Sequence, residues 1–567
     1  MFSNTKIKFN VLVSLTVIFN FYIFLLSYLN YNSTRGTDYD KYGPYLEYFT
    51  FGLDSRLQEQ GVGYFWFVSS ISKLQINSLK TSPIFESLLH NFGIHVANFI
   101  FYVLGILGVY FLLKHLKISK ITALYAINLI AIFPPILGAR MILKPEIMAF
   151  AFLPWIILFI FKFYDEDRKV NLFLLIPFTA LLITSKASIA LMIALSLVIC
   201  IKKELFRKQL LYVILLFIPL VYLLFFESFQ VNGNYVWDHK IPNGYDNIAD
   251  LKFLFLINSD LVSNPFRNSQ ANSMLGILFL DTFGDYWQRY WNHKDGWLGN
   301  QHPGNKNLNI IGIFISACFY IILLYQLFKE KNKKMKYIGS LSFVGLGVLL
   351  ITIFNVFPFL TKNFNPQKGD PIKTHYFSFF LALSLIYLVI KLFSIQNRTI
   401  SIIVYFLIFI FCLQITKGAS INEIRESQNS WNKIHLLSPC FLNDPISKFI
   451  TYSDNWCSQE EVSLSICAGT YTPGLLPVQK DDYLIFPKDD TYEQRNLVLN
   501  SNIVTVSNYY ECLNYADGGY VLQITEKYFF NNNRKAPIAF IFCLFSSILI
   551  IFNYIFFNST KKEFKSI

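Results

Sequence analysis

Apolar runs that match the thickness of a lipid bilayer recur along this sequence, and they constrain its fold more than any other feature. A bilayer-spanning helix needs roughly 20 mainly apolar residues. Of the 567 residues, 54% are hydrophobic and only 15% are charged, which excludes an ordinary soluble domain. The sequence therefore predicts an all-α polytopic membrane protein with about twelve transmembrane helices. We expect the spans at about 9–29, 93–113, 121–137, 147–163, 170–185, 187–201, 209–226, 307–328, 338–359, 376–393, 400–416 and 536–557.

Lysine and arginine residues gather in every second gap between these runs. Examples are the clusters at 114–120, 202–208 and 329–336. This alternation follows the positive-inside rule. It predicts a multi-pass protein of the plasma (inner) membrane with both termini in the cytoplasm and the remaining gaps outside. The same rule accounts for the net charge of +13, so we expect the lipid bilayer as a partner and no nucleic acid.

The long gaps divide the chain into three expected parts. Residues 1–416 form a transmembrane catalytic region with large outer loops at 30–92 and 227–306. Residues 417–533 form a small extracytoplasmic α/β domain, and residues 534–567 form the last helix with a cytoplasmic tail. Strands are expected in this domain where residues alternate or are β-branched, at Tyr483–Phe486, Ile503–Val506 and Gly519–Ile524.

Cysteine positions agree with this division. Four lie within expected spans and are interpreted as small apolar residues, namely Cys200, Cys318, Cys412 and Cys543. The other four all lie in 417–533, namely Cys440, Cys457, Cys467 and Cys512. An even number confined to one outer segment predicts two disulfides in an oxidising compartment. The three pairings stay open, and a zinc site is the alternative.

Ionisable side chains of both signs gather at the outer ends of the expected spans. The stretch TRGTDYDKYGPYLEY, residues 34–48, places Asp38 and Asp40 just after the first span. Six further candidates follow at other outer span ends: Arg140, Lys144, Glu146, Lys186, Lys373 and His375. A charge costs about 2.5–3.5 kcal/mol at the bilayer centre and less near the interface. Such a group therefore indicates function: carboxylates suit proton abstraction or metal binding, and cations suit a phosphate ligand.

Each of these residues also has a structural interpretation. The aspartates can solvate a loop or cap a helix, and Lys144-Pro145-Glu146 can start a helix. Lys186 can extend to the interface, and His375 can be an interface residue. The tryptophans of 281–297 are expected in an interfacial aromatic belt.

Taken together, these motifs resemble the GT-C superfamily of membrane glycosyltransferases. The shared elements are an acid-bearing first outer loop, a basic-Pro-Glu motif between the third and fourth spans, a Thr-Ser-Lys turn at 184–186 and the entry KTHYF at 373–377. The stretch PIKTHYFSFF also resembles the Lys-Trp-Thr-His-His-Phe signature of mycobacterial arabinosyltransferases, without its Trp and second His. The first loop offers Asp-Tyr-Asp where the superfamily usually has an Asp-Glu pair.

The resemblance implies sugar transfer from a polyprenyl-phosphate donor to an acceptor hydroxyl, with inversion, on the extracytoplasmic face, as in polysaccharide biosynthesis at the cell envelope. Asp38 or Asp40 would be the catalytic base, and the choice between them stays open. Arg140, Lys144, Lys373 or His375 would hold the leaving phosphate, and Glu146 would orient a cation or the sugar; Lys186 joins the substrate-binding candidates. The acceptor would be a glycan, a lipid or a protein. The resemblance implies no certain cofactor, and a divalent metal remains an alternative because carboxylates converge.

Three rival functions remain open. One is a structural or assembly subunit without catalysis, which would tolerate the loss of Asp38 and Asp40 together. An O-antigen-type polysaccharide polymerase also shows a Gly-x-Asp-Tyr-x-x-Tyr stretch, which Gly36–Tyr42 fits, and would use an oligosaccharide on a diphosphate. A transporter or lipid flippase predicts charges or Gly/Pro breaks near mid-span. In this sequence the charges lie at the outer span ends instead.

Overall fold

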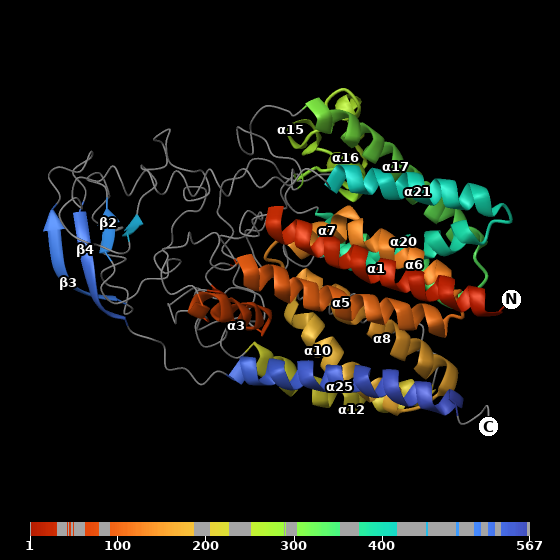
Figure 1. Cartoon of the computed structure of the whole chain (residues 1–567), viewed down its shortest axis with the longest axis horizontal. Helices are drawn as coiled ribbons and strands as arrows, with labels where there is room; N and C mark the ends of the chain where they lie inside the picture. The colour runs from red at the N-terminus through yellow and green to blue at the C-terminus, as the bar shows by residue number, and fades with distance from the viewer. Residues whose placement is uncertain are drawn as a thin grey trace.

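A computed structural model gives the arrangement of the chain. It describes residues 2–30, 42, 45–46, 49, 63–78, 91–185, 204–225, 251–287, 290, 303–351, 373–416, 449–451, 483–486, 504–511, 520–527 and 535–563. Within these ranges the membrane part is helical (Figure 1). The longer helices are α1 (Phe2–Asn30), α3 (Gly63–Ser78), α5 (Asn91–His115), α6 (Lys120–Ile132), α8 (Glu146–Glu166), α10 (Leu175–Ser185), α12 (Glu204–Leu224), α17 (Pro303–Lys329), α18 (Lys333–Ile351), α20 (Ser378–Phe393), α21 (Arg398–Thr416) and α25 (Lys535–Glu563). The short ones are α7 (Pro134–Met141), α9 (Val170–Phe173), α14 (Leu251–Phe255), η3 (Ser259–Leu261), α15 (Arg267–Gln270), α16 (Met274–Phe283) and η6 (Thr374–Phe377).

The polytopic membrane fold is confirmed, whereas the count of twelve spans is not. In the described part of the chain, eight helices are long and apolar enough to cross a membrane, and the bent pair α6–α7 makes a ninth. Three shorter apolar helices occupy Val170–Thr184, Tyr212–Leu224 and Met274–Phe283. The first two coincide with expected spans, but they are shorter than the roughly 20 residues that cross a bilayer upright. The expected span at 187–201 lies outside the described residues.

The third expected span, at 121–137, is not straight. Helix α6 ends at Ile132 and α7 begins at Pro134, with an angle of 55° between them. Proline lacks an N–H donor and forces the residue before it into an extended conformation. Phe133 is extended, with φ −64° and ψ 119°, just before Pro134 and Pro135. The prolines therefore turn α7 out of line with α6 and direct its C-terminal end, with Arg140, along a new course.

Helix α8 is the most deeply enclosed of the long helices, because α5, α10 and α20 pack around it. Its contact with α5 depends on small residues. A methyl group on Gly105 of α5 would lie 2.6 Å from the Phe150 ring and 2.7 Å from the Phe150 carbonyl oxygen. Glycines let two helix backbones approach closely in a membrane protein. The start of α8, where Glu146 lies, is thereby fixed against α5.

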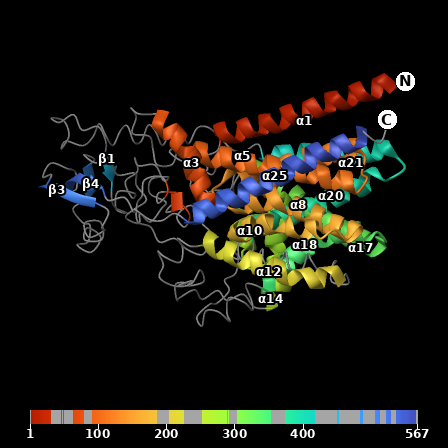
Figure 2. The same cartoon turned by 90° about the horizontal axis from the view of Figure 1, so that it is seen from below.

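The bundle has two chemically different ends. At the end that holds both termini, charged side chains connect helices: His115 of α5 lies 3.1 Å from Asp165 of α8, and Lys334 of α18 pairs with the same carboxylate. Figures 1 and 2 show the N- and C-terminal ends close to each other on this side. The beginnings of α5, α8 and α20 therefore lie at the other end of the bundle, and the site residues lie there with them.

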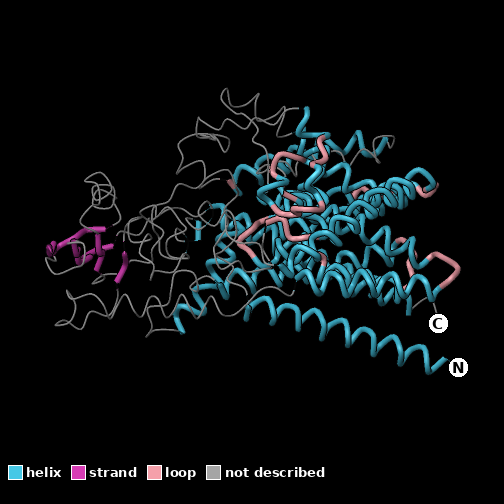
Figure 3. Tube along the Cα trace, turned by 90° about the horizontal axis from the view of Figure 1, so that it is seen from above, coloured by secondary structure: helices cyan, strands magenta, loops and turns pink. Residues whose placement is uncertain are grey.

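Four strands lie in the polar C-terminal segment (Figure 3). They are β1 (Phe449–Thr451), β2 (Tyr483–Phe486), β3 (Val504–Glu511) and β4 (Tyr520–Lys527), in the order β1-β2-β4-β3. Strand β1 pairs with β2 in parallel, and β4 pairs with both β2 and β3 antiparallel. The last three coincide with the stretches in which strands were expected. The rest of 417–533 lies outside the described residues, so an α/β domain there remains a prediction.

Candidate functional site

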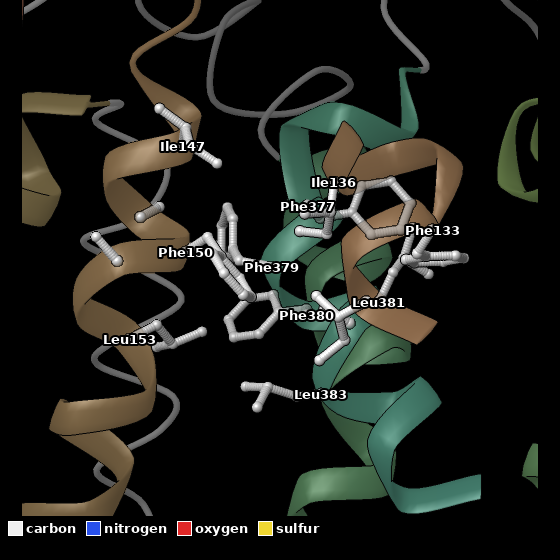
Figure 4. Close-up of a cluster of buried hydrophobic side chains, with 14 of the residues drawn as sticks. Phe133, Ile136, Ile147, Phe150, Leu153, Phe377, Phe379, Phe380, Leu381 and Leu383 are labelled. Atoms are coloured by element: carbon white, nitrogen blue, oxygen red, sulfur yellow. The ribbon is translucent and has the colours of Figure 1, made fainter. Parts of the chain in front are cut away.

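A cluster of buried apolar side chains supports the turns that carry the candidate residues (Figure 4). Ile147 and Phe150 of α8 face Phe379 and Phe380 of α20, and Ile136 of α7 lies beside Phe377. Ile147 immediately follows Glu146 in the sequence, and Phe377 immediately follows Tyr376. Apolar packing therefore brings the starts of α8 and α20 together, although more than 200 residues separate them.

The first turn, between α7 and α8, carries Lys144. Its backbone is held by Asn98 of α5, whose side-chain amide donates to the carbonyl oxygens of Arg140 at 2.8 Å and Ile142 at 2.9 Å. Asn98 in turn accepts from the Tyr64 hydroxyl at 2.7 Å. The predicted helix start at Pro145-Glu146 is confirmed, because α8 begins at Glu146 with Pro145 as its N-cap.

Burial raises the pKa of Tyr64 far above its usual range, and hydrogen bonds with the Lys144 backbone and Asn98 counteract only part of this effect. Tyr64 belongs to α3, which is not one of the candidate spans. Its hydroxyl therefore stays protonated at physiological pH and keeps a donor for Asn98.

The second turn, at the start of η6, carries Lys373 and His375. Its backbone is held by Asp281 at the end of α16. The Asp281 carboxylate accepts from the Thr374 N–H at 2.8 Å and from the Thr374 hydroxyl at 2.6 Å. The same hydroxyl also lies 3.1 Å from the Asp281 carbonyl oxygen. All these groups are buried, so the hydrogen bonds form without competition from water.

The two turns meet at the ring of Tyr376. The ammonium nitrogens of Lys144 and Lys373 each lie 5.7 Å from the centre of this ring. Both lysines are more than nine-tenths buried, whereas Tyr376 is partly exposed. An ammonium group within about 6 Å of an aromatic centre is attracted to the ring face. Tyr376 is thus an aromatic partner that both ammonium groups share.

Cations and aromatic rings alternate beyond Tyr376 in both directions. Lys144 also lies 5.1 Å from the ring centre of Tyr42, and Lys373 lies 4.7 Å from that of Trp287. The other neighbour of Trp287 is Arg267 of α15, at 4.5 Å. The series therefore connects the first outer loop, the 142–145 turn, the 373–376 turn and the segment 267–287. Its three cations favour an anionic ligand.

Arg140 adds a fourth cation, in a different environment. It is 2% exposed, and its guanidinium lies 4.6 Å from the ring centre of Tyr102. Neither terminal nitrogen has a hydrogen-bond partner among the described residues. Buried donors are almost always paired, and an unpaired charged one is costly. Such a group is suited to a ligand that brings its own acceptor oxygens.

Glu146 and His375 are also buried at this end of the bundle. The structure thus brings together Arg140, Lys144, Glu146, Lys373 and His375, five of the eight candidate site residues, on adjoining turns. Asp38, Asp40 and Lys186 lie outside the described residues, as do Cys440, Cys457, Cys467 and Cys512. Along the sequence, the described residue nearest to the two aspartates is Tyr42, and the Lys144 ammonium lies over its ring.

The structure corrects one expectation and adds residues that the sequence did not single out. Trp287 was expected in an interfacial belt, but it is only 4% exposed and lies between Arg267 and Lys373. Asn98, Asp281 and Tyr376 were missed as well. The one signal for Asp281 was its position as the sole charge in the apolar stretch MLGILFLDTF, which is α16.

Within the described ranges, no group of three or more His, Cys, Asp or Glu side chains is arranged to hold a metal ion. The aspartates of the first outer loop lie outside the described residues. Metal binding at this site therefore stays an untested alternative.

A family model and a chain among solved structures are similar to this protein. Residues 82–226 match the family model of dolichyl-phosphate-mannose-protein mannosyltransferases, a stretch that includes Asn98, Arg140, Lys144 and Glu146. Among solved structures, one similar chain is ArnT from Cupriavidus metallidurans bound to undecaprenyl phosphate, at 10% identity and a TM-score of 0.41, covering 90% of this chain and 97% of that one. No curated protein sequence matches significantly. The family-model match confirms the predicted resemblance of this multi-pass membrane protein to the GT-C glycosyltransferases.

Proposed function

We propose that this protein transfers a sugar from a polyprenyl-phosphate donor to an acceptor hydroxyl on the extracytoplasmic face of the membrane. The observation that carries this proposal is the convergence of Lys144 and Lys373 on the ring of Tyr376. Two buried ammonium groups beside one aromatic ring give this place a concentration of positive charge, which favours an anionic ligand. A phosphate monoester with a lipid tail supplies that anion and places its chain among the apolar helices.

The chemistry follows from the charges that each group carries. Asp38 or Asp40 accepts the proton of the acceptor hydroxyl, and the hydroxyl oxygen attacks the anomeric carbon from the side opposite the phosphate. The bond between the anomeric carbon and the phosphate oxygen breaks, so the configuration inverts and polyprenyl phosphate leaves. Lys144, Lys373 and Arg140 stabilise the charge that develops on that oxygen, and Glu146 and His375 orient the sugar.

The family-model match supports the same donor class, because the proteins of that family are described as dolichyl-phosphate-mannose-dependent. In this proposal, residues 1–416 carry the catalysis, and 417–533 bind the acceptor or cover the site from outside. The sugar is a hexose or a pentose, and the acceptor is a glycan, a lipid or a protein.

The phosphate role is tested by neutralising each lysine. Lys144→Met and Lys373→Met are expected to lower kcat/KM for transfer from a polyprenyl-phosphate sugar at least 100-fold, because each removes a charge that stabilises the leaving phosphate. Lys162→Met is a matched control: Lys162 is also a lysine of α8 placed over a tyrosine ring, 4.4 Å from the centre of Tyr554. It lies at the other end of that helix and should keep its activity. Equal activity in all three variants would contradict the proposal.

The base is tested by the double substitution Asp38→Asn with Asp40→Asn. We expect no transfer product in purified membranes, with expression and membrane insertion unchanged. Each single substitution then assigns the base, since only one carboxylate needs to accept the proton. Undiminished transfer by the double variant would remove this loop from the mechanism.

A further inference from the structure

We infer that Asp281 and Asn98 are positioning residues that hold the two lysine-bearing turns in place for the binding of one phosphate. This inference rests on the proposed function, and it concerns residues that do not themselves touch the donor. Each residue comes from a helix that carries none of the candidate phosphate ligands: Asn98 from α5 and Asp281 from α16. Each holds backbone groups of a turn through side-chain hydrogen bonds.

The Lys373 turn is fixed at one residue, Thr374. Its N–H and its hydroxyl both donate to the Asp281 carboxylate, at 2.8 and 2.6 Å. The backbone of Thr374 therefore cannot rotate without breaking a charge-assisted hydrogen bond in a buried place. Lys373 and His375 leave the chain on either side of it. The direction of both side chains is consequently set by Asp281.

The Lys144 turn is fixed at two carbonyl oxygens. Asn98 uses both hydrogens of its amide, one for Arg140 and one for Ile142, at 2.8 and 2.9 Å. A side chain that spans residues i and i+2 fixes the bend between them. Arg140 ends helix α7 and Lys144 precedes α8, so this bend determines where each cation points.

Two anchors on different helices explain how the turns keep their spacing. Lys144 and Lys373 carry like charges near one ring, and they repel each other when no anion is present. If the turns were flexible, the ammonium groups would move apart. Bringing them back together on binding would then cost free energy and weaken the affinity for the phosphate. Buried, fully bonded anchors keep the two charges in place before the ligand arrives.

The test measures binding of undecaprenyl phosphate to the full-length purified protein in detergent, by calorimetry, together with KM and kcat for transfer. Thr374→Val removes the hydroxyl that donates to Asp281 and keeps the shape of the side chain. Loss of one buried hydrogen bond to a charged group predicts roughly tenfold weaker binding and a correspondingly higher KM, with kcat changed less. Thr374→Ser restores the donor and should restore the affinity.

The neighbouring Thr282 offers a matched control. Its hydroxyl is also buried, donates to the Leu278 carbonyl oxygen at 2.7 Å and lies 3.0 Å from the Tyr320 hydroxyl. Thr282→Val should bind undecaprenyl phosphate as the wild type does, within about twofold. Asp281→Leu and Asn98→Leu should weaken binding more than Thr374→Val does, and Asp281→Asn, which keeps an acceptor oxygen, should weaken it less than Asp281→Leu.

The outcomes separate the two proposals. If the wild type does not bind undecaprenyl phosphate, the proposed function fails and this inference fails with it. If the wild type binds but Thr374→Val binds equally well, the positioning role alone is overturned. The role is also overturned if Thr374→Val and Thr282→Val weaken binding to the same extent, because a general loss of folding then explains both.

Discussion

Arg140 carries a buried charge that the described residues around it balance poorly. It is buried, and among the described residues its terminal nitrogens contact no acceptor. The face of Tyr102 offers only partial compensation. Such a group lowers stability. Proteins often keep groups of this kind at functional sites, where activity requires them.

This imbalance predicts opposite effects on stability and function. Arg140→Met replaces the cation by an apolar side chain of similar length and should raise the free energy of unfolding by about 1–3 kcal/mol. The same change should abolish binding of undecaprenyl phosphate. Thermal unfolding in detergent with and without this lipid measures both quantities. A variant that unfolds more easily than the wild type, yet still binds the lipid, would show that Arg140 serves the fold.

At the scale of elements, the contact between α5 and α8 positions the Lys144 turn of the site. Helix α5 supplies Asn98 and α8 begins at Glu146, so a shift of one helix against the other displaces the Lys144 turn. The close approach depends on Gly105 and Gly108, which face Phe150 and Trp155. The sequence predicted both helices but not this contact, since a glycine within an apolar run carries no signal of its neighbour.

Gly105→Ala is expected to lower the free energy of unfolding by about 1–3 kcal/mol, because the added methyl group meets both the ring and the backbone of Phe150. Gly347→Ala in α18 is the matched control. A methyl group there meets nothing within 4 Å, so it should be neutral or stabilise by about 0.5–1 kcal/mol. Thermal unfolding of the two variants in one detergent compares them. Equal effects would contradict the close packing of α5 on α8.

A second prediction concerns Glu330, between α17 and α18. Burial acts to raise the pKa of this carboxyl, but hydrogen bonds from Lys391, the Asn332 backbone and Tyr387, with the Lys391 charge, together hold it below its usual range. A depressed pKa contributes stability above the unfolded pKa and loses it as the pH falls through the folded value. Acidification below the usual Glu range should therefore weaken the interactions by which Glu330, between α17 and α18, binds Lys391 and Tyr387 of α20.

The substitution Glu330→Gln should remove that part of the pH dependence and cost about 1 kcal/mol at neutral pH, since the Lys391 side chain is partly exposed. Unfolding midpoints from pH 7 down to below the usual Glu range measure the difference. Glu204→Gln is the control, because Glu204 pairs with Lys208 on an exposed helix surface. A wild type and a Glu330→Gln variant with parallel pH profiles would contradict the prediction.

At the scale of the whole molecule, the two ends of the bundle differ. The ion pairs of His115 and Lys334 with Asp165 lie at the end with both termini, and the candidate site lies at the other end (Figure 1). The cytoplasmic side of the termini and the outer side of the site remain predictions from charge alternation. The C-terminal segment between α21 and α25 belongs to the end of the site by chain connectivity, because each of these helices crosses the bundle once.

This arrangement predicts two disulfides among Cys440, Cys457, Cys467 and Cys512. Intact-mass measurement after alkylation should show these four cysteines blocked before reduction and free after it. Cys318, Cys412 and Cys543, which are free in the structure, serve as internal controls. Alkylation of all eight cysteines in the unfolded protein without reductant would place the segment in a reducing compartment and reverse the predicted topology.

The sequence by itself determined the class of fold, because a run of some 20 apolar residues has few stable alternatives to a membrane helix. It also selected charged residues at the expected span ends as site candidates, among them Lys144 and Lys373. Local chemistry further predicted the start of α8 at Pro145-Glu146 and the stretches of three strands.

Only the tertiary structure decided which distant residues meet. Nothing in the sequence relates Lys144 to Lys373, or Asp281 to Thr374, since packing between helices is set by shape along the whole contact and not by local pattern. The same reason explains why Trp287 was wrongly expected in an interfacial belt. Tryptophan is a residue type that suits a membrane interface, but the packing places this one between Arg267 and Lys373. Sequence selected the charged side chains, and the packing of α7, α8, α16 and α20 brought them to one place.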